Sequence, residues 1–421
     1  MEFHNTQVSW SRIKLDQLCI QITDGKHGDC QDQPGSGYYF LSCKDIFDGK
    51  VNYHGARQIT EADFHDTHRR TKFAAEDILV TNSGTIGRMA IAPNNDLTKR
   101  TTFQKSVAIL KPNKHIITPK FLYYSLRSEV ERLIEFAGGT AQKNLLLRDL
   151  RSFEIPLPPL PIQRRIADIL SAYDDLIENN QRRIAILETM ARSLYREWFV
   201  HYRYPGHEAV PLVDSPLGPI PQGWEVRKLG EVCTRIDSGG TPKRGVAEYW
   251  ESGEINWYKT GELWDAFLFE SQEKITSRGQ KESSAKLFYP GTILMAIYGS
   301  PTVGRMGILT EVSTCNQAAL GLVANDFFIS QIFLYFTLYS LRDFFNQTAQ
   351  GAAQQNISKE KVASTLAIIP PRNILGPFDQ IVSPIFEQLQ ALQRQTQNLR
   401  RTRDLLLPRL LSGQIDVGDV E

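Results

Sequence analysis

Basic side chains follow two glycine turns of this chain, an arrangement that could bind the phosphates of a nucleic acid. In Ser238-Gly-Gly-Thr-Pro-Lys-Arg244 the glycines would let backbone amides approach phosphate groups, while Lys243 and Arg244 add positive charge. The corresponding turn earlier in the chain is Thr23-Asp-Gly-Lys-His27. A flexible solvated turn has the same composition. The pattern therefore favours phosphate contact over a plain surface turn without excluding the latter.

Further basic and amide side chains are candidates for contact with DNA. The densest basic cluster is His68-Arg-Arg-Thr-Lys72, although a charge run is usually a solvated face. Arg88 and Arg305 each follow a glycine, a recurrence that fits internal packing as well as DNA contact. Glutamine amides can read base edges and also cap turns. The complete set of candidate DNA contacts is Lys26, His27, Arg69, Arg70, Lys72, Arg88, Gln104, Lys105, Gly240, Thr241, Lys243, Arg244, Lys259, Arg305, Gln317, Gln354 and Gln355.

Motifs for catalysis, nucleotides and metals are missing from the sequence. There is no Asn-Pro-Pro-aromatic or Asp-Pro-Pro-aromatic tetrapeptide for an amino-methyltransferase, no G-x-G-x-x-G after a strand, and no H-E-x-x-H. Gly299 to Met306 has the glycine spacing of a phosphate loop, but Arg305 and Met306 replace its Lys and Ser/Thr. Asp24-Gly-Lys26 resembles the tail of a nuclease motif and is better explained as a turn. We expect no catalytic or metal site in this chain.

Composition limits the class of protein only loosely. The chain has 421 residues, 41% hydrophobic and 23% charged, which is ordinary for a globular protein of two or three domains. Because the net charge is only +1, DNA binding must use local basic clusters or a partner that shares the footprint. The five cysteines form no Cys-x-x-Cys pair, and with no signal peptide recognised they suggest reduced thiols in the cytoplasm. The most apolar run, Phe327 to Leu341, predicts a buried helix and no membrane span.

Two long helical patterns must position these candidates. Apolar residues repeat by threes and fours from Ile162 to Phe199, and again from Ile381 to Leu410. We expect an antiparallel intramolecular helix pair that holds two modules apart, the first helix spanning roughly 54 Å. The predicted seam of the first helix steps through Leu176, Asn180 and Ile184, a stutter in which Asn180 fixes register. The outer apolar positions, which should be exposed for partners, are Leu170, Ile177, Ile186 and Met190.

The start of the second helix has two interpretations. Pro384 either kinks that helix near its beginning or, with Ser383 as the cap, marks its first turn.

The two halves of the chain repeat each other at an offset of 214 residues near the start, as in Trp10 and Trp224, and of 212 further on, as in Thr102 and Thr314. A repeat of this length indicates duplication of a whole domain with its following helix. Each copy should run through strands, a short apolar helix (121–135 and 333–345), a strand ending at Pro-Pro, and the long helix. The connection 204–221 should be extended. Predicted boundaries are 1–155, 156–204, 205–370 and 371–421.

Five short motifs are distributed along the chain. They are Pro158-Pro-Leu-Pro-Ile-Gln-Arg-Arg-Ile166, Leu194-Tyr-Arg-Glu-Trp-Phe-Val200, Gly218-Pro-Ile-Pro-Gln-Gly-Trp224, Ser238-Gly-Gly-Thr-Pro242 and Leu406-Leu-Pro-Arg-Leu-Leu-Ser-Gly413. Together they resemble the DNA specificity subunit of type I restriction-modification systems. The resemblance covers essentially the whole chain, although Pro371 to Pro377 lacks the Leu-x-x-Gln found at the start of the first long helix.

This resemblance implies an α/β (α+β) fold with two target recognition domains, related by a pseudo-twofold axis and separated by a long antiparallel two-helix coiled coil. Each domain would read one half of a bipartite site on double-stranded DNA. The helices would dock two methyltransferase subunits, through which restriction subunits join. The chain itself would bind no cofactor and catalyse nothing: S-adenosylmethionine would belong to the methyltransferase, and ATP and Mg to the restriction subunit.

Two other functions are compatible with the residues. A self-contained restriction-modification enzyme would transfer methyl groups from S-adenosylmethionine to DNA by itself. A scaffold that does not bind DNA would leave the sequence selectivity of its complex unchanged when it is exchanged. The family resemblance favours the specificity subunit over both.

Overall fold

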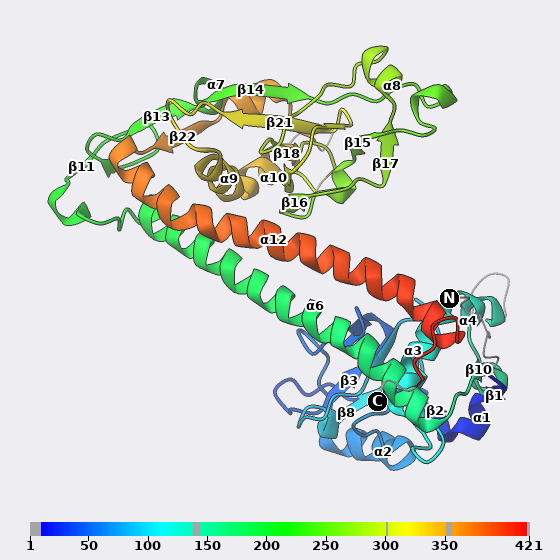
Figure 1. Cartoon of the computed structure of the whole chain (residues 1–421). Helices are drawn as coiled ribbons and strands as arrows, with labels where there is room; N and C mark the ends of the chain where they lie inside the picture. Colours follow the sequence, from blue (N-terminus) through cyan, green and yellow to red (C-terminus); the bar gives the residue numbers. More distant parts are fainter. Residues whose placement is uncertain (1–9, 138–143, 300–301, 351–355, 419–421) are drawn as a thin grey trace. The chain divides into compact units, whose positions relative to one another are not determined.

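The computed structural model describes residues 10–137, 144–299, 302–350 and 356–418 (Figure 1). The chain forms two compact units: Met1–Ile177 with Asn398–Glu421 is unit 1, and Glu178–Gln397 is unit 2. The division passes through both long helices, so each unit contains a segment of each helix.

Unit 1 is built on a four-stranded antiparallel sheet of order β2-β9-β6-β7. Three two-stranded pairs accompany it: β1 with β10, β3 with β8, and β4 with β5. The strands are β1 Arg12–Lys14, β2 Cys19–Asp24, β3 Tyr39–Leu41, β4 Ile46–Phe47, β5 Lys50–Val51, β6 Ile78–Thr81, β7 Met89–Ile91, β8 Thr101–Phe103, β9 Val107–Pro112 and β10 Glu154–Pro156. The helices are α1 Leu15–Leu18, α2 Glu61–Thr71, α3 Pro119–Ser128, α4 Val130–Phe136 and α5 Leu147–Ser152.

Unit 2 contains a five-stranded sheet of order β14-β21-β18-β19-β16 and a three-stranded sheet of order β17-β15-β20. Two further pairs are β11 with β12 and β13 with β22. The strands are β11 Leu212–Val213, β12 Ile220–Pro221, β13 Glu225–Lys228, β14 Cys233–Ser238, β15 Ile255–Tyr258, β16 Ala266–Leu268, β17 Glu273–Ile275, β18 Ile293–Ala296, β19 Met306–Leu309, β20 Ser313–Cys315, β21 Ala319–Ala324 and β22 Leu366–Ile369. The shorter helices are α7 Leu229–Val232, α8 Ser277–Lys281, α9 Gln331–Ser340, α10 Arg342–Gln350 and α11 Lys359–Ser364.

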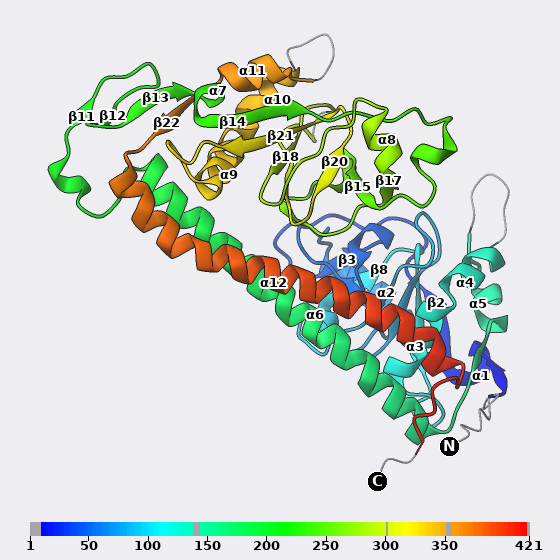
Figure 2. The same cartoon turned by 45° about the horizontal axis from the view of Figure 1, so that its top comes forward.

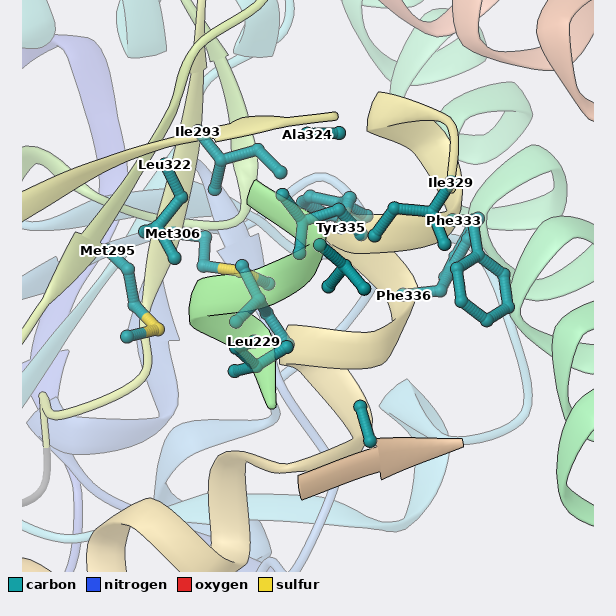
Figure 3. Packing of buried hydrophobic residues seen from close by; sticks show 14 of the residues in the cluster. Leu229, Ile293, Met295, Met306, Leu322, Ala324, Ile329, Phe333, Tyr335 and Phe336 are labelled. Carbon is teal, nitrogen blue, oxygen red and sulfur yellow. The ribbon is translucent and has the colours of Figure 1, made fainter. Parts of the chain in front are cut away.

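Both faces of the main sheet of unit 2 are buried, and the alternation of strand side chains divides them between two cores. Ile293 and Met295 of β18 belong to the same hydrophobic core as Phe333 and Phe336 of α9 (Figure 3). The intervening Leu294 faces the opposite core. In unit 1, Ile78 and Leu79 of β6 are divided between two cores in the same way. The run of apolar residues in these strands is therefore explained by burial on both sides.

The predicted duplication is confirmed at the level of strand register. In unit 1, Gln21 and Thr23 of β2 pair with Lys111 and Ile109 of β9, after a register shift that follows Cys19. In unit 2, the corresponding residues of β14 and β21 pair in the same way after a shift that follows Cys233: Arg235 with Val323 and Asp237 with Gly321. Positions 21 and 23 therefore correspond to positions 235 and 237.

The predicted single apolar helix is wrong in both copies, because each is divided into two helices. In unit 1 the break falls at Glu129, whose N–H bonds the Leu126 carbonyl three residues back at 3.2 Å. In unit 2, Leu341 separates α9 from α10. Apolar positions continue after both breaks, with Leu133 and Phe345 completely buried. The spacing of apolar residues therefore did not predict the two helix breaks.

The connection between the repeats is partly folded, which corrects the expectation of an extended segment. Its strands β11 and β12 form an antiparallel pair. Tyr204 is 3% exposed, and its ring centroid lies 5.4 Å from that of Trp224. The apolar run from Phe327 to Leu341 becomes mainly the buried helix α9, as predicted. Among the helices of the described residues, none is long and apolar enough to cross a bilayer.

The long helices are α6 Leu160–Tyr195, continued by a π-helical turn Arg196–Val200, and α12 Arg372–Leu411. In unit 1 the side chain of Arg403 bonds Asp174, while Leu410 packs in the same core as Ile166. In unit 2, Asn180 Nδ2 donates to Gln395 Oε1 at 3.1 Å. Residue numbers fall along one helix as they rise along the other, and the segments lie side by side in Figures 1 and 2. The predicted antiparallel pairing is confirmed within each unit.

The predicted seam of α6 needs one correction. Ile177 is 5% exposed and Leu176 is 48% exposed, so the seam passes through Ile177. The steps from Ile177 to Asn180 and Ile184 are then three and four residues, so the stutter predicted at Asn180 is absent. Leu170 is also buried, so the predicted exposure of Leu170 and Ile177 is wrong. Adjacent residues are about 100° apart on a helix, and an apolar stripe is wide enough to accommodate either one.

Exposure of the other two outer apolar residues is confirmed: Ile186 is 53% exposed and Met190 is 54% exposed. The start of α12 is also resolved. The helix begins at Arg372 and continues through Pro384, so Ser383 is not its cap. The Pro371 carbonyl accepts the Leu375 N–H at 3.2 Å and closes the first turn. The helix therefore starts directly after the Pro-Pro corner, as α6 does.

Candidate nucleic-acid interface

The two predicted glycine turns have the same local geometry. Gly25 follows β2, and a Cβ atom placed on it would lie 1.9 Å from the Phe103 carbonyl oxygen. Gly239 follows β14, and its Cβ would lie 2.2 Å from the Cys315 carbonyl oxygen. These carbonyls accept the next N–H of each turn, from Lys26 at 2.7 Å and from Gly240 at 2.9 Å. Glycine is required at Gly25 and Gly239 because another part of the backbone passes so close.

This geometry changes what the turns can offer to a phosphate. The N–H groups of Gly239 and Gly240 are bonded to the carbonyls of Ala319 and Cys315. The sequence had suggested that free backbone amides of this turn approach the phosphates. Because these two amides are already bonded, contact with DNA at these positions would come from neighbouring side chains.

In unit 1, four predicted basic residues from separate segments line one open hollow of about 470 Å³. Lys26 and His27 come from the glycine turn, and Arg69 and Arg70 from the end of α2. Thr60 caps the start of this helix, because its hydroxyl accepts the Asp63 N–H at 3.3 Å, and Lys72, with a φ of 46°, caps its end. The other residues that line the hollow are Asp66 and Thr67.

Carboxylates hold the cations of this hollow in place. Lys26 Nζ lies 2.7 Å from Asp63 Oδ1 and 3.5 Å from Asp66 Oδ2. The hydrogen bond from Lys26 lowers the pKa of Asp63, and the same bond raises the pKa of Lys26. Arg70 lies 3.1 Å from Asp24, which is also 2.9 Å from the ring Nε2 of His27. The hollow therefore combines oriented hydrogen-bond donors with nearly balanced charge, a chemistry suited to reading base edges as well as phosphates.

The remaining candidates of unit 1 lie in different places. Gln104 forms a β-bridge with Lys26, and the Lys105 N–H donates to the Lys26 carbonyl at 3.1 Å, so both are beside the turn. Lys72 is exposed at the end of α2 and does not line the hollow. Arg88 is exposed before β7 and does not line it either.

In unit 2, Arg244 and Lys259 converge on Glu273. The Arg244 guanidinium forms an ion pair with this carboxylate, and Lys259 Nζ lies 2.7 Å from it. Hydrogen bonds from Lys259 and Arg244 lower the pKa of Glu273. Arg244 also lies over the Trp250 ring, 3.8 Å from its centroid. The guanidinium is therefore held by both an aromatic ring and a carboxylate.

The glycine turn of unit 2 is tied to the same region. Trp257 Nε1 donates to the Gly240 carbonyl at 2.9 Å, and the Thr241 hydroxyl donates to Gln317 Oε1. Trp257 is 2% exposed and Tyr258 is 1% exposed, so both aromatic residues belong to the core of unit 2. These contacts bring together residues from three segments of the sequence: Gly240, Thr241 and Arg244, then Lys259, and then Gln317.

Two other candidates of unit 2, Lys243 and Arg305, do not belong to this group by these contacts. Lys243 has an exposed side chain, and its carbonyl accepts a hydrogen bond from Trp250. The Arg305 guanidinium lies over Trp264, 4.5 Å from the ring centroid, and Trp264 is 65% exposed. Gln354 and Gln355 lie outside the described residues.

The acidic partners Asp63, Asp66 and Glu273 escaped the sequence analysis. Each orients a cation that the sequence did identify, yet Glu273 is 29 residues from Arg244 and Asp63 is 37 residues from Lys26. The capping pattern of Thr60 and Asp63 was a usable local signal for the start of α2. The ion pair between Asp63 and Lys26 forms only in the tertiary fold, so this pattern could not reveal it.

Comparison with known proteins identifies related sequences and folds. The model of the "Type I restriction modification DNA specificity domain" matches residues 32–189 and 221–402. The MjaIX specificity subunit of a type I restriction enzyme from Methanocaldococcus jannaschii is 29% identical, covering 92% of this chain and 88% of the relative. The MjaVIII specificity subunit of the same organism is 23% identical, covering 100% and 96%. The crystal structure of a type I restriction-modification S subunit from M. genitalium covers 100% of this chain and 99% of its own, with a TM-score of 0.63 and 18% identity.

Proposed function

The chain belongs to the family of type I restriction modification DNA specificity proteins, and from this membership we propose how its two units share the reading of DNA. The chain is a specificity subunit of a type I restriction-modification system. Unit 1 reads one half of a bipartite site and unit 2 reads the other half. The chain selects the DNA sequence, and other subunits methylate and cleave the DNA.

One observation carries this division: the same backbone framework supports different polar side chains in the two units. Gly25 and Gly239 occupy equivalent close approaches of the backbone. Around Gly25 lies the hollow of Lys26, Arg69 and Arg70, whereas Gly239 is followed by Thr241 with its Gln317 partner. Phosphate contacts position a protein on DNA, while base contacts specify the sequence. Unlike donors on a common framework would therefore read two unlike half-sites.

The partners follow from the same assignment. Two methyltransferase subunits bind the long helices, where Ile186 and Met190 expose apolar surface on α6. The methyltransferase carries S-adenosylmethionine and methylates adenine. Restriction subunits carrying ATP and Mg join through the methyltransferase, and the complex works on double-stranded DNA in the cytoplasm.

Selection from a random DNA library tests the proposal. The full chain, assembled with methyltransferase subunits of its restriction-modification system, is bound to the library and the retained sequences are read. We expect two short fixed sequences separated by a spacer of constant length and variable sequence. One contiguous site, or no enrichment, would contradict the assignment.

A further inference from the structure

Three cations converge on one carboxylate beside the glycine turn of unit 2. Arg235 Nε lies 3.0 Å from Asp237 Oδ2, while Lys286 Nζ and Lys359 Nζ lie 3.2 and 3.1 Å from Asp237 Oδ1. The group comes from three separate parts of the chain: β14, the segment before β18, and α11. Three positive charges against one negative charge leave a net charge of +2 at this point.

The fold does not require this cluster. The positions equivalent to Arg235 and Asp237 in unit 1 are Gln21 and Thr23, which occupy the same strand register next to the same bulge. Unit 1 therefore builds the strand and its glycine turn with neutral side chains at both positions. Because unit 1 folds without these charges, we relate the cluster of unit 2 to what unit 2 binds and not to how it folds.

The cluster is accessible, and it adjoins the proposed reading surface. The side chains of Lys286 and Lys359 are 44% and 43% exposed. A Cβ on Gly240 would lie 2.4 Å from the backbone of Ser284, two residues before Lys286, so the turn and this segment are in contact. An anion bound by the two lysines would therefore lie next to the turn that carries Thr241.

The members of the cluster have different tasks. Arg235 is anchored, because it also donates to the Leu287 carbonyl at 2.8 Å and lies 4.4 Å from the Phe288 ring centroid. Partial burial raises the pKa of Asp237, but hydrogen bonds from Arg235, Lys359 and Lys286 outweigh it and lower the pKa to about 2. Asp237 therefore stays ionised at neutral pH and orients both ammonium groups. Each ammonium has three donors, so one bond to Asp237 leaves donors for a second acceptor.

We propose that Lys286 and Lys359, held by Asp237 and Arg235, bind a backbone phosphate of the DNA half-site that unit 2 reads. This inference rests on the proposed function, because it takes DNA as the anion. A phosphate fits the excess positive charge, since charge-assisted hydrogen bonds to phosphate are short and strong. The contact carries no sequence information itself. It sets the register at which neighbouring side chains such as Thr241 and Gln317 meet the bases.

The salt dependence of DNA binding tests the proposal in the complete complex with methyltransferase subunits. The double variant Lys286→Gln, Lys359→Gln should bind the selected DNA more weakly, and its plot of log Kobs against log salt should be shallower by about one, the contribution of one neutralised phosphate. The control variant is Lys274→Gln, which removes a lysine of unit 2 that is paired with Glu270 at 3.1 Å. Its slope should equal that of the wild type. The conservative variant Lys286→Arg, Lys359→Arg should restore the slope.

Methylphosphonate substitution locates the phosphate. Neutral linkages are placed one at a time along the DNA. One or two adjacent positions near the half-site of unit 2 should weaken wild-type binding by about tenfold and should weaken the double glutamine variant much less.

An unchanged salt slope, or equal methylphosphonate penalties in both proteins, would overturn the proposal and leave the cluster with a structural role only. Thermal unfolding of each variant separates loss of folding from loss of contact. A wild-type complex without sequence-selective binding would instead contradict the proposed function itself.

Discussion

Asn180 of α6 and Gln395 of α12 share a hydrogen bond of 3.1 Å, although Asn180 is only 4% exposed. A buried amide in a helix seam costs stability and specifies register, because only one alignment gives it a partner. We therefore expect Asn180 to fix how the two helices are aligned within unit 2.

We expect Asn180→Leu to loosen that alignment without unfolding the protein. Leucine buries more apolar surface, so the thermal midpoint should stay equal or rise, while the choice of register weakens. Methylation of a DNA library with spacers of different length should then show a broader spacer preference. The control is Asn179→Leu, which changes the neighbouring exposed asparagine. A lower thermal midpoint with an unchanged spacer preference would contradict this role of Asn180.

The glycine turn of unit 2 makes a second prediction. Gly239→Ala would force a Cβ to within 2.2 Å of the Cys315 carbonyl oxygen, so the turn must move. We expect a loss of about 2–4 kcal/mol in the free energy of unfolding of unit 2 and loss of selectivity at its half-site, with the other half-site still read. The matched control is Gly245→Ala, where nothing lies within 4 Å of the added Cβ. Urea unfolding and library selection measure the two effects.

The stability of unit 2 in acid should depend on Asp237. Its folded pKa of about 2 is below the usual value of 3.8, so the ionised carboxylate stabilises the fold above pH 4 and this contribution is lost as the pH falls toward 2. The shift corresponds to on the order of 1–2 kcal/mol after allowance for solvent screening. The difference in unfolding free energy between wild type and Asp237→Asn should therefore shrink between pH 5 and pH 3. Asp326→Asn, an exposed aspartate of the same unit, controls for loss of one carboxylate.

Duplication made much of the fold predictable from sequence. Each strand pattern occurs twice in the sequence, so a strand predicted in one copy was also predicted in the other. The matching registers of β2 with β9 and of β14 with β21 confirm this duplication. The errors arose where only tertiary contacts decide. Leu176 and Ile177 both satisfy the helical period, and packing within unit 1 selects Ile177. Glu129 interrupts a helix whose apolar pattern continues on the far side.

The sequence identified the basic residues of the candidate site, but it did not show which of them lie close together. Lys26 was identified by its glycine turn and Arg70 by the basic cluster at 68–72, but they line one hollow only because of how the fold places α2 beside the end of β2. The Asp237 cluster left no local signal, because Lys286 and Lys359 are 49 and 122 residues away from that carboxylate. Ion pairs between residues so far apart in the sequence can be recognised only from the folded structure.

The exposed apolar pair on α6 gives the last prediction. Ile186 and Met190 are four residues apart, so they lie on one side of the helix, and both are more than half exposed. A methyltransferase subunit bound there would bury them, and a lysine at either position would then be trapped without a partner charge. We expect Ile186→Lys, Met190→Lys to abolish complex formation in size-exclusion chromatography, while the thermal midpoint of the isolated chain changes by less than a few degrees, because these side chains touch water in that state. Phe327→Lys is the control: Phe327 is 77% exposed in unit 2 and lies outside the long helices, so its replacement should leave assembly intact. Normal assembly of the double variant would exclude this side of α6 as the docking surface.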